Sequence, residues 1–146
     1  MSTIETHWAQ QYVGLRWVSG ARGPDTFDCW GLLWWVKKHH YGQEVPEYPG
    51  VDAASLGIVT SLIDSGARQG DWEQLLFPMD GCAVGMSKGR RLHHVGIYVD
   101  VDGGLVLHAH DKARVLAQSI SSLRSAGYRR IEFFEYKPHG THHRDN

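Results

Sequence analysis

Two distant parts of the chain carry residues whose types suit nucleophilic catalysis. Cys29 stands at the edge of an apolar segment, and two pairs of histidines follow far downstream, His93 with His94 and His108 with His110. A nucleophilic thiol needs a base, normally histidine, and a third group that orients the base. The residues therefore predict a thiol nucleophile that is assembled with histidines from elsewhere in the fold.

The segment that follows Cys29 predicts a buried helix over residues 29–41. Residues 30–36 are almost all apolar, residues 37–40 are lysines and histidines, and Gly42 comes next. Cations in a last turn followed by glycine are typical of a helix C-terminus. The apolar residues surround nearly the whole helix, which indicates burial on most sides.

The thiol of Cys29 would lie in the first turn of this helix, with Thr26 or Asp28 as the N-cap. The partial positive charge of a helix N-terminus and its unpaired N–H groups favour a thiolate there. The alternative is a free cysteine that packs as a small hydrophobic residue beside tryptophan and leucine. Position alone leaves both interpretations open.

The segment HHVGIYVD at residues 93–100 predicts a strand that carries the base. Alternation places His94 on one face with Gly96, and Val95 on the other. Glycine inside a strand often marks close approach by another backbone, so we expect a helix to come near the face of His94. Either histidine of the pair can alternatively be a solvated strand end.

The segment LVLHAH at residues 105–110 supplies the third group, provided that the hairpin has the correct register. A three-residue loop at 101–103, with its glycine in the left-handed region, would place His108 opposite Gly96 and diagonal to His94. A two-residue loop would invert every side chain. In the first register His110 lies directly opposite His94 and stays a rival orienter.

The remaining pattern predicts an α+β fold with N-terminal helices packed on a mainly antiparallel sheet of five to six strands. Helices are expected at 4–13, 51–67 and 119–127, and a loop at 15–28. Strands are expected at 82–87, 93–100, 105–110, 113–118 and 128–136. We expect one domain over 1–138 and a flexible polar tail at 139–146.

Composition and charge give no indication of several classes of binding partner. The chain has 146 residues, of which 42% are hydrophobic, and a formal net charge of −1, so nothing indicates binding to nucleic acid or to an anionic membrane. No stretch reaches the roughly 18 apolar residues of a membrane span, and the first residues lack a signal peptide. We expect synthesis in the cytoplasm, export only by another system, and two free cysteines.

The linked motifs GPDTFDCWGLLWWV and HHVGIYVDVDGGLVLHAH resemble those of the NlpC/P60 family of papain-like cysteine peptidases. The likeness runs from about Val13 to Tyr136. It implies Cys29 as nucleophile, His94 as base and His108 as third residue. It also implies the family's fold, no cofactor or metal, and cleavage of peptidoglycan stem peptides, commonly between D-glutamate and a diamino acid.

Two departures from the family pattern bear on substrate and setting. Trp30 stands where wall-degrading members usually carry serine, which resembles the branch found among bacteriophage tail-assembly proteins of the K type. That branch implies phage tail proteins as partners, and action in a virion tail tip or in the periplasm and cell wall. Arg16 and Trp17 replace the usual Pro-Tyr, so Trp17 and Asp28 are the candidates for substrate binding or oxyanion positioning; an indole only donates.

Other functions remain open at this point. Cys29, His94, His108 and His110 are residue types that bind zinc, although no Cys-x-x-Cys or His-Glu-x-x-His motif accompanies them. A structural tail-tip protein with little activity and an exported effector amidase also fit the pattern. Cys82 is expected to pack in the core.

Overall fold

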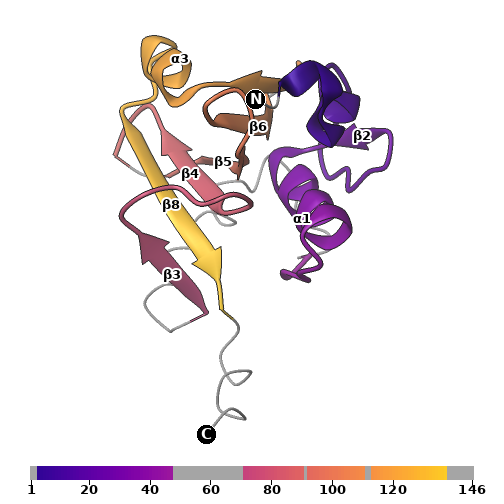
Figure 1. The fold of residues 1–146 in the computed structure, drawn as a ribbon, viewed down its shortest axis with the longest axis horizontal. Helices are drawn as coiled ribbons and strands as arrows, with labels where there is room; N and C mark the ends of the chain where they lie inside the picture. Colours follow the sequence, from indigo (N-terminus) through magenta and orange to yellow (C-terminus); the bar gives the residue numbers. More distant parts are fainter. Residues whose placement is uncertain (1–2, 48–70, 91, 111–112, 138–146) are drawn as a thin grey trace, which may run out of the picture.

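The computed structural model describes residues 3–47, 71–90, 92–110 and 113–137. Figure 1 shows one helix, α1 (Cys29–His40), lying beside a twisted sheet, and a short helix, α3 (Ile120–Ser125), at the far end of that sheet. The helix expected at 51–67 and the tail at 139–146 lie outside the described residues. The α+β class is confirmed.

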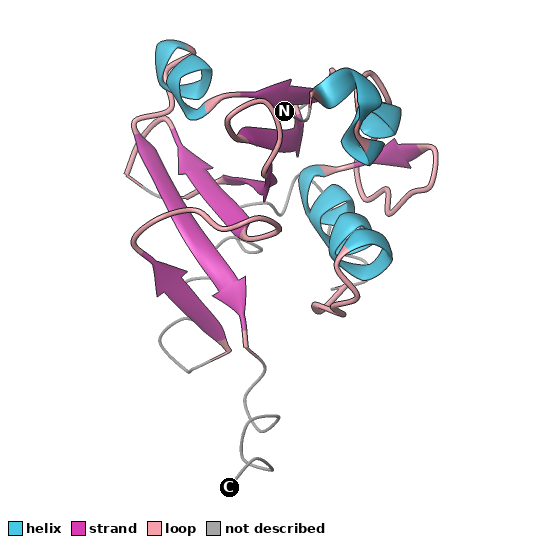
Figure 2. Cartoon of the chain, viewed as in Figure 1, coloured by secondary structure: helices cyan, strands magenta, loops and turns pink. Residues whose placement is uncertain are grey.

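The N-terminal segment differs from the helix expected at 4–13. It forms two 3₁₀ turns, η1 (Ile4–Thr6) and η2 (Trp8–Tyr12), of which η2 buries Ala9 and Tyr12. The segment expected to be a loop contains two short parallel strands, β1 (Arg16–Trp17) and β2 (Thr26–Phe27). These pieces lead the chain to the start of α1 (Figure 2).

The main sheet has six strands in the order β3-β8-β4-β5-β6-β7, and every neighbouring pair is antiparallel. The sequence pattern missed β3, because it carries two exposed polar residues between Trp72 and Leu75. The strands are β3 (Trp72–Leu75), β4 (Ala83–Ser87), β5 (His94–Val99), β6 (Leu105–Ala109), β7 (Val115–Gln118) and β8 (Arg130–Tyr136).

The two faces of the sheet bury separate hydrophobic clusters. On one face Val95 and Ile97 pack with Leu32 and Leu33 of α1. On the other face Val106 packs with residues that include Leu123 of α3. Alternation along each strand assigns every side chain to one of these faces, and this assignment decides where the candidate site residues lie.

A buried lysine fixes α1 against the sheet. Lys37 is 2% exposed, and its Nζ donates to the carbonyl of Gly81 at 2.8 Å and to a carboxylate oxygen of Glu135 in β8 at 3.0 Å. A buried ammonium is tolerated only when it is paired and hydrogen-bonded in this way. The helix is therefore tied to the sheet at a point two turns from the thiol.

Within the described ranges, none of the helices combines the length and apolar character that a membrane crossing requires.

Candidate active site

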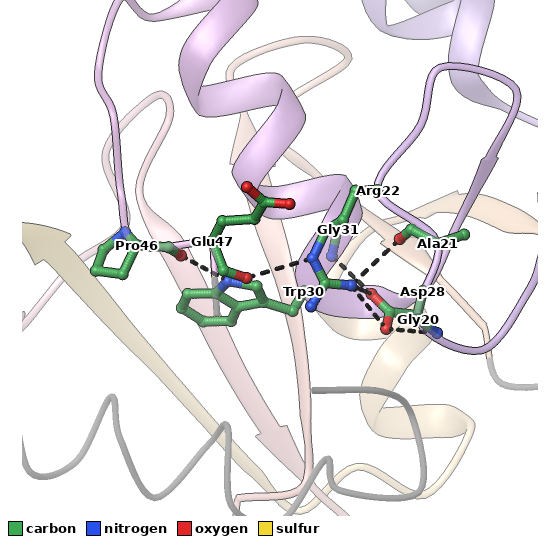
Figure 3. A network of polar contacts seen from close by, with 8 residues as sticks. All are labelled: Gly20, Ala21, Arg22, Asp28, Trp30, Gly31, Pro46 and Glu47. Atoms are coloured by element: carbon green, nitrogen blue, oxygen red, sulfur yellow. Dashed lines mark hydrogen bonds and ion pairs between the residues drawn. The ribbon is translucent and has the colours of Figure 1, made fainter. Parts of the chain in front are cut away.

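Asp28 caps the helix that begins at Cys29, as the sequence predicts. Its side chain accepts from the backbone N–H of Gly31 at 2.7 Å and of Gly20 at 3.1 Å, and Nη1 of Arg22 lies 2.9 Å from Oδ1 (Figure 3). Burial raises the pKa of Asp28, and the hydrogen bond from Gly31 and the Arg22 charge oppose that rise.

The glycine two residues after the thiol has a steric reason. A Cβ on Gly31 would lie 2.1 Å from the carbonyl oxygen of Ala21, and the same carbonyl accepts from the N–H of Asp28 at 3.0 Å. The loop before the helix therefore presses directly on its first turn. Only glycine leaves room for that contact.

Trp30 closes the opposite side of the helix start. The ring is 1% exposed, and Nε1 donates to the carbonyl of Pro46 at 2.8 Å. Arg22 reaches the same segment, because its Nε donates to the carbonyl of Glu47 at 3.3 Å (Figure 3). Trp30 thus holds Pro46, and Arg22 holds Glu47, beside the start of the helix.

The sulfur of Cys29 lies where two strands of the sheet part. The β5–β6 ladder ends at the pair Ile97 and Leu107, and Val95, the next residue to face β6, donates its backbone N–H to the thiol instead. Alternate residues of an antiparallel strand point their N–H groups to the same neighbour. The thiol therefore lies beside β5 at the residue that follows His94.

Burial acts against the predicted ionisation of Cys29. Burial raises the pKa of the thiol to about 12, assisted by the negative charge of Asp28, while the N–H groups of Val95 and Trp30 act in the opposite direction. The side chain is 3% exposed, so the helix N-terminus does not offset the loss of solvation. Burial therefore favours the neutral thiol over the thiolate.

His94 and His108 are brought together by the sheet. Nε2 of His94 lies 2.8 Å from Nδ1 of His108, and the rings are 4% and 0% exposed. The predicted register is confirmed, because Ile97 pairs with Leu107 and thus sets His108 opposite Gly96. The turn is longer than expected, at 100–104, yet Gly103 has the expected positive φ of 79°.

The helix that approaches the face of His94 is α3, through Leu123, and not α1. His94 pairs with Met86 of β4 and shares its face, whereas α1 packs on the face of Val95. A Cβ on Gly96 would meet Val106, the Leu107 carbonyl and His108, so this glycine makes room for β6. Cys29 thus meets the backbone beside His94, and proton transfer between the two side chains stays a prediction.

Burial keeps both imidazoles neutral. It lowers the pKa of His94 well below its usual value, and neighbouring His108 and His93 add to this effect. Burial also lowers the pKa of His108 to about 4, against a hydrogen bond with Gln118 that favours protonation. The ring of His94 stacks on Tyr128, with centroids 6.0 Å apart.

Trp17 lines a cleft of about 420 Å³ at the junction of β1 and β7, together with Arg16, Ala113, Arg114 and Leu116. Asp28, the other candidate for substrate binding, is 2% exposed and uses both oxygens within the protein. It positions the helix that carries Cys29. Contact of either residue with substrate stays a prediction.

The remaining candidates are placed as follows. His110 Nδ1 is buried without a hydrogen-bond partner in the part of the chain that the structure describes. Cys82 is a free cysteine that is fully buried. Among the described residues, no group of three or more His, Cys, Asp and Glu side chains is arranged to hold a metal ion.

Sequence reasoning missed Arg22 and Gln118, which contact Asp28 and His108. Arg22 lies in a segment dense in glycine, whose path no periodicity reveals. Gln118 had a usable signal, because it lies in a predicted strand and strand pairing alone places it near His108.

The NlpC/P60 family profile matches residues 14–131. Among curated proteins, the probable endopeptidase p60 of Listeria grayi is 32% identical over 103 residues, which is 70% of this chain and 17% of the relative. The corresponding protein of Listeria monocytogenes is 30% identical, over 70% of this chain and 18% of the relative. The chain therefore spans less than a fifth of the length of these relatives.

Solved structures agree with this match at the level of the fold. The NlpC/p60 domain of the peptidoglycan hydrolase SagA is 19% identical with a TM-score of 0.54, over 86% of this chain and 91% of that one. NlpC2 of Trichomonas vaginalis is 20% identical with a TM-score of 0.57, over 88% and 44%. With a capped helix that starts at a cysteine and a histidine pair on the adjoining sheet, the chain belongs to the NlpC/P60 family.

Proposed function

We propose that the protein is a cysteine peptidase or amidase that hydrolyses an amide bond of peptidoglycan stem peptides. The observation that carries the proposal is the hydrogen-bonded pair His94–His108 in a strand whose next residue, Val95, donates to the thiol of Cys29. The curated relatives are named endopeptidases, and one structural relative is named a peptidoglycan hydrolase. These names support the substrate class.

The reaction follows from a neutral resting pair. His94 takes the thiol proton as Cys29 attacks the amide carbonyl, so that charge develops only in the transition state. The backbone N–H of Cys29, at the positive end of α1, stabilises the oxyanion. The imidazolium then returns the proton to the leaving amine, and water hydrolyses the thioester to regenerate the thiol.

The finer proposal is cleavage between D-glutamate and a diamino acid, in the setting of a phage tail or prophage. The buried Trp30 after the nucleophile, where serine is usual, is the residue that supports this setting. Tail proteins are then the partners that deliver the domain to the wall, in a virion tail tip or after export to the periplasm.

Digestion of purified peptidoglycan, with products identified by mass spectrometry, tests the reaction and the bond. The wild-type chain is expected to release fragments that end in D-glutamate. Cys29→Ala should release none, whereas Cys82→Ala, which removes the other buried thiol, should retain cleavage. Fragments of the same mass from Cys29→Ala would overturn the assignment, and cleavage at a different bond would overturn the finer proposal alone.

A further inference from the structure

Hydrogen bonds continue from the histidine pair into the next strand and helix. His108 Nε2 lies 2.8 Å from Oε1 of Gln118, and Nε2 of Gln118 lies 3.2 Å from Oγ of Ser122. With the bond of 2.8 Å between His94 and His108, four side chains from β5, β6, β7 and α3 are linked in series.

The protons of this series are placed by the group at its end. An amide oxygen only accepts, so Nε2 of His108 carries the hydrogen that it donates to Gln118. A neutral imidazole carries one hydrogen, so Nδ1 of His108 accepts from Nε2 of His94. Nδ1 of His94 is then left with a lone pair, which is the form that a base requires.

The orientation of the Gln118 amide is held by α3. Ser122 lies in the first turn of that helix, where its backbone N–H donates to the N-cap Ser119 at 3.0 Å. Its hydroxyl oxygen accepts a hydrogen bond from the side-chain amide N–H of Gln118, and this orients the side-chain oxygen of Gln118 toward His108. The reversed amide would donate to His108, and the same logic would then leave Nδ1 of His94 protonated and unable to act as a base.

We propose that Gln118 is a positioning residue that selects, through His108, the tautomer in which Nδ1 of His94 accepts the proton of Cys29. The catalytic meaning rests on the proposed function, but the tautomer is measurable without turnover. Failure of one is therefore distinguishable from failure of the other.

Groups on several elements act on this pair. His93, His110 and Lys88 oppose a positive charge on His94, and Tyr128 stacks on its ring. His110 acts on His108 in the same direction. A substitution at position 118 alters none of these groups. A shifted pH profile in such a variant therefore reports the hydrogen bonds that link Gln118 to His94 through His108.

Nitrogen NMR of histidine-labelled protein at pH 7.5 tests the tautomers directly. His94 should show a protonated Nε2 and an unprotonated Nδ1, and His108 the same pattern. In Gln118→Leu, which has no acceptor, both rings should show mixed tautomers. A protonated Nδ1 on His94 in the wild-type protein would overturn the proposal.

The kinetics of Gln118→Glu distinguish the hydrogen-bonding role of Gln118 from its role in packing, because glutamate keeps the shape of the glutamine side chain. A carboxylate beside His108 should raise its pKa by about one unit or more, and protonated His108 would donate from Nδ1 and force the wrong tautomer on His94. The acidic limb of kcat should therefore move to higher pH, with kcat at alkaline pH within about threefold of wild type and KM unchanged.

Gln118→Leu should instead lower kcat about tenfold or more at every pH, a typical loss for a misoriented base. Gln10→Glu, at an exposed glutamine, should change neither quantity. A profile of Gln118→Glu that superimposes on wild type would overturn the proposal even if Gln118→Leu fails to fold.

A second inference comes from the cleft at β1 and β7. The backbones of Arg16 and Arg114 form an isolated antiparallel β-bridge. Both residues line the cleft together with Trp17. Arg114 donates to the carbonyl of Gly14 at 2.8 Å. Among the described residues neither guanidinium has a carboxylate partner, so two positive charges flank one cavity.

The cleft lies in line with the histidine pair. His110, two residues after His108, donates its backbone N–H to the carbonyl of Arg114 at 2.9 Å, and Arg114 forms a β-bridge with Arg16. Two strand spacings of about 4.8 Å separate His110 from Arg16, or roughly 10 Å across the sheet. This is the reach of a short peptide whose scissile bond lies at the histidine end.

The geometry points to this cleft as a subsite for a free carboxylate of the peptide substrate, with Arg16 and Arg114 as its ligands. Guanidinium groups bind carboxylates bidentately, and the indole offers a surface for the peptide. The inference deepens the proposed function and rests on it for the substrate class.

Matched stem peptides, with free or amidated carboxylates, test this subsite. Cys29→Ala protein should bind the free form about tenfold more tightly, as expected of a charge-assisted site, and adding Arg16→Gln with Arg114→Gln should remove the difference. Arg124→Gln, at an exposed arginine of α3, should preserve it. Equal binding of both peptides to Cys29→Ala, or a preference that survives the double change, would overturn the subsite, whatever the outcome of the cleavage assay.

Discussion

At the start of α1 a buried carboxylate and a guanidinium form an ion pair beside the thiol, whereas on the sheet two imidazoles and an amide are linked without formal charge. The first region fixes the position of a backbone element. The second fixes the positions of protons. The contrast indicates that the proposed nucleophile, Cys29, and the proposed base, His94, are held by separate sets of contacts, which separate substitutions should disrupt.

The largest expected effect is on stability at the nucleophile side. Asp28→Ala removes the cap of α1 and the carboxylate that pairs with Arg22, whose side chain is 12% exposed. Breaking a buried ion pair in this way costs roughly 3–5 kcal/mol. Urea unfolding should show this loss of free energy of unfolding.

Two further variants sharpen that test. Asp28→Asn keeps an acceptor for Gly31 and should lose less. Asp25→Ala, at an exposed aspartate of the same loop, should lose almost nothing. Equal stability of Asp28→Ala and Asp25→Ala would show that the ion pair does not hold the helix.

The next effect is the pH dependence of stability on the sheet side. The pKa of His108 is lowered from 6.5 to about 4, so between these values the unfolded chain binds the proton more readily than the folded one. The stabilisation is complete above pH 6.5 and is lost as the pH falls toward 4, by an amount on the order of 3 kcal/mol.

Urea unfolding at a series of pH values measures this slope. His108→Asn should flatten it, with the remaining slope due to His94, while His39→Asn, at an exposed histidine, should leave it intact. An unchanged slope in His108→Asn would contradict a neutral buried pair.

The smallest of these effects concerns activity and decides between the two orienters. His108→Ala removes the acceptor for His94 and should lower kcat about 10²-fold, which is about 2.7 kcal/mol. His110→Ala should leave kcat within about threefold. The reverse ranking, measured on the same stem peptide, would assign the orienting role to His110.

The nucleophile side could be predicted from sequence because its determinants are local. The cap Asp28, the apolar run and the cations before Gly42 lie within a few residues of Cys29 and define α1 by themselves. The register of β5 and β6 was also accessible from sequence, because His94 and His108 can share one face of the sheet only if the loop between the two strands has an odd number of residues. Both results needed only short-range rules.

The rest depends on contacts that no local rule contains. The face of the sheet that α1 covers follows from packing of the whole helix, and the sequence did not reveal which helix would cover the face of His94. Arg22 reaches Asp28 through an irregular loop. The thiol was expected to be ionised, and the burial that raises its pKa comes from surrounding elements, which composition does not reveal.

The bond between Lys37 and Glu135 joins α1 to β8, a strand that inserts between β3 and β4 although it is made after both. During translation the helix that presents the thiol has no counter-ion for its inward ammonium until that strand leaves the ribosome. A growing polypeptide would thus carry a loosely seated nucleophile for most of its synthesis. The anchor of this helix is therefore completed only when the last strand of the sheet has been made.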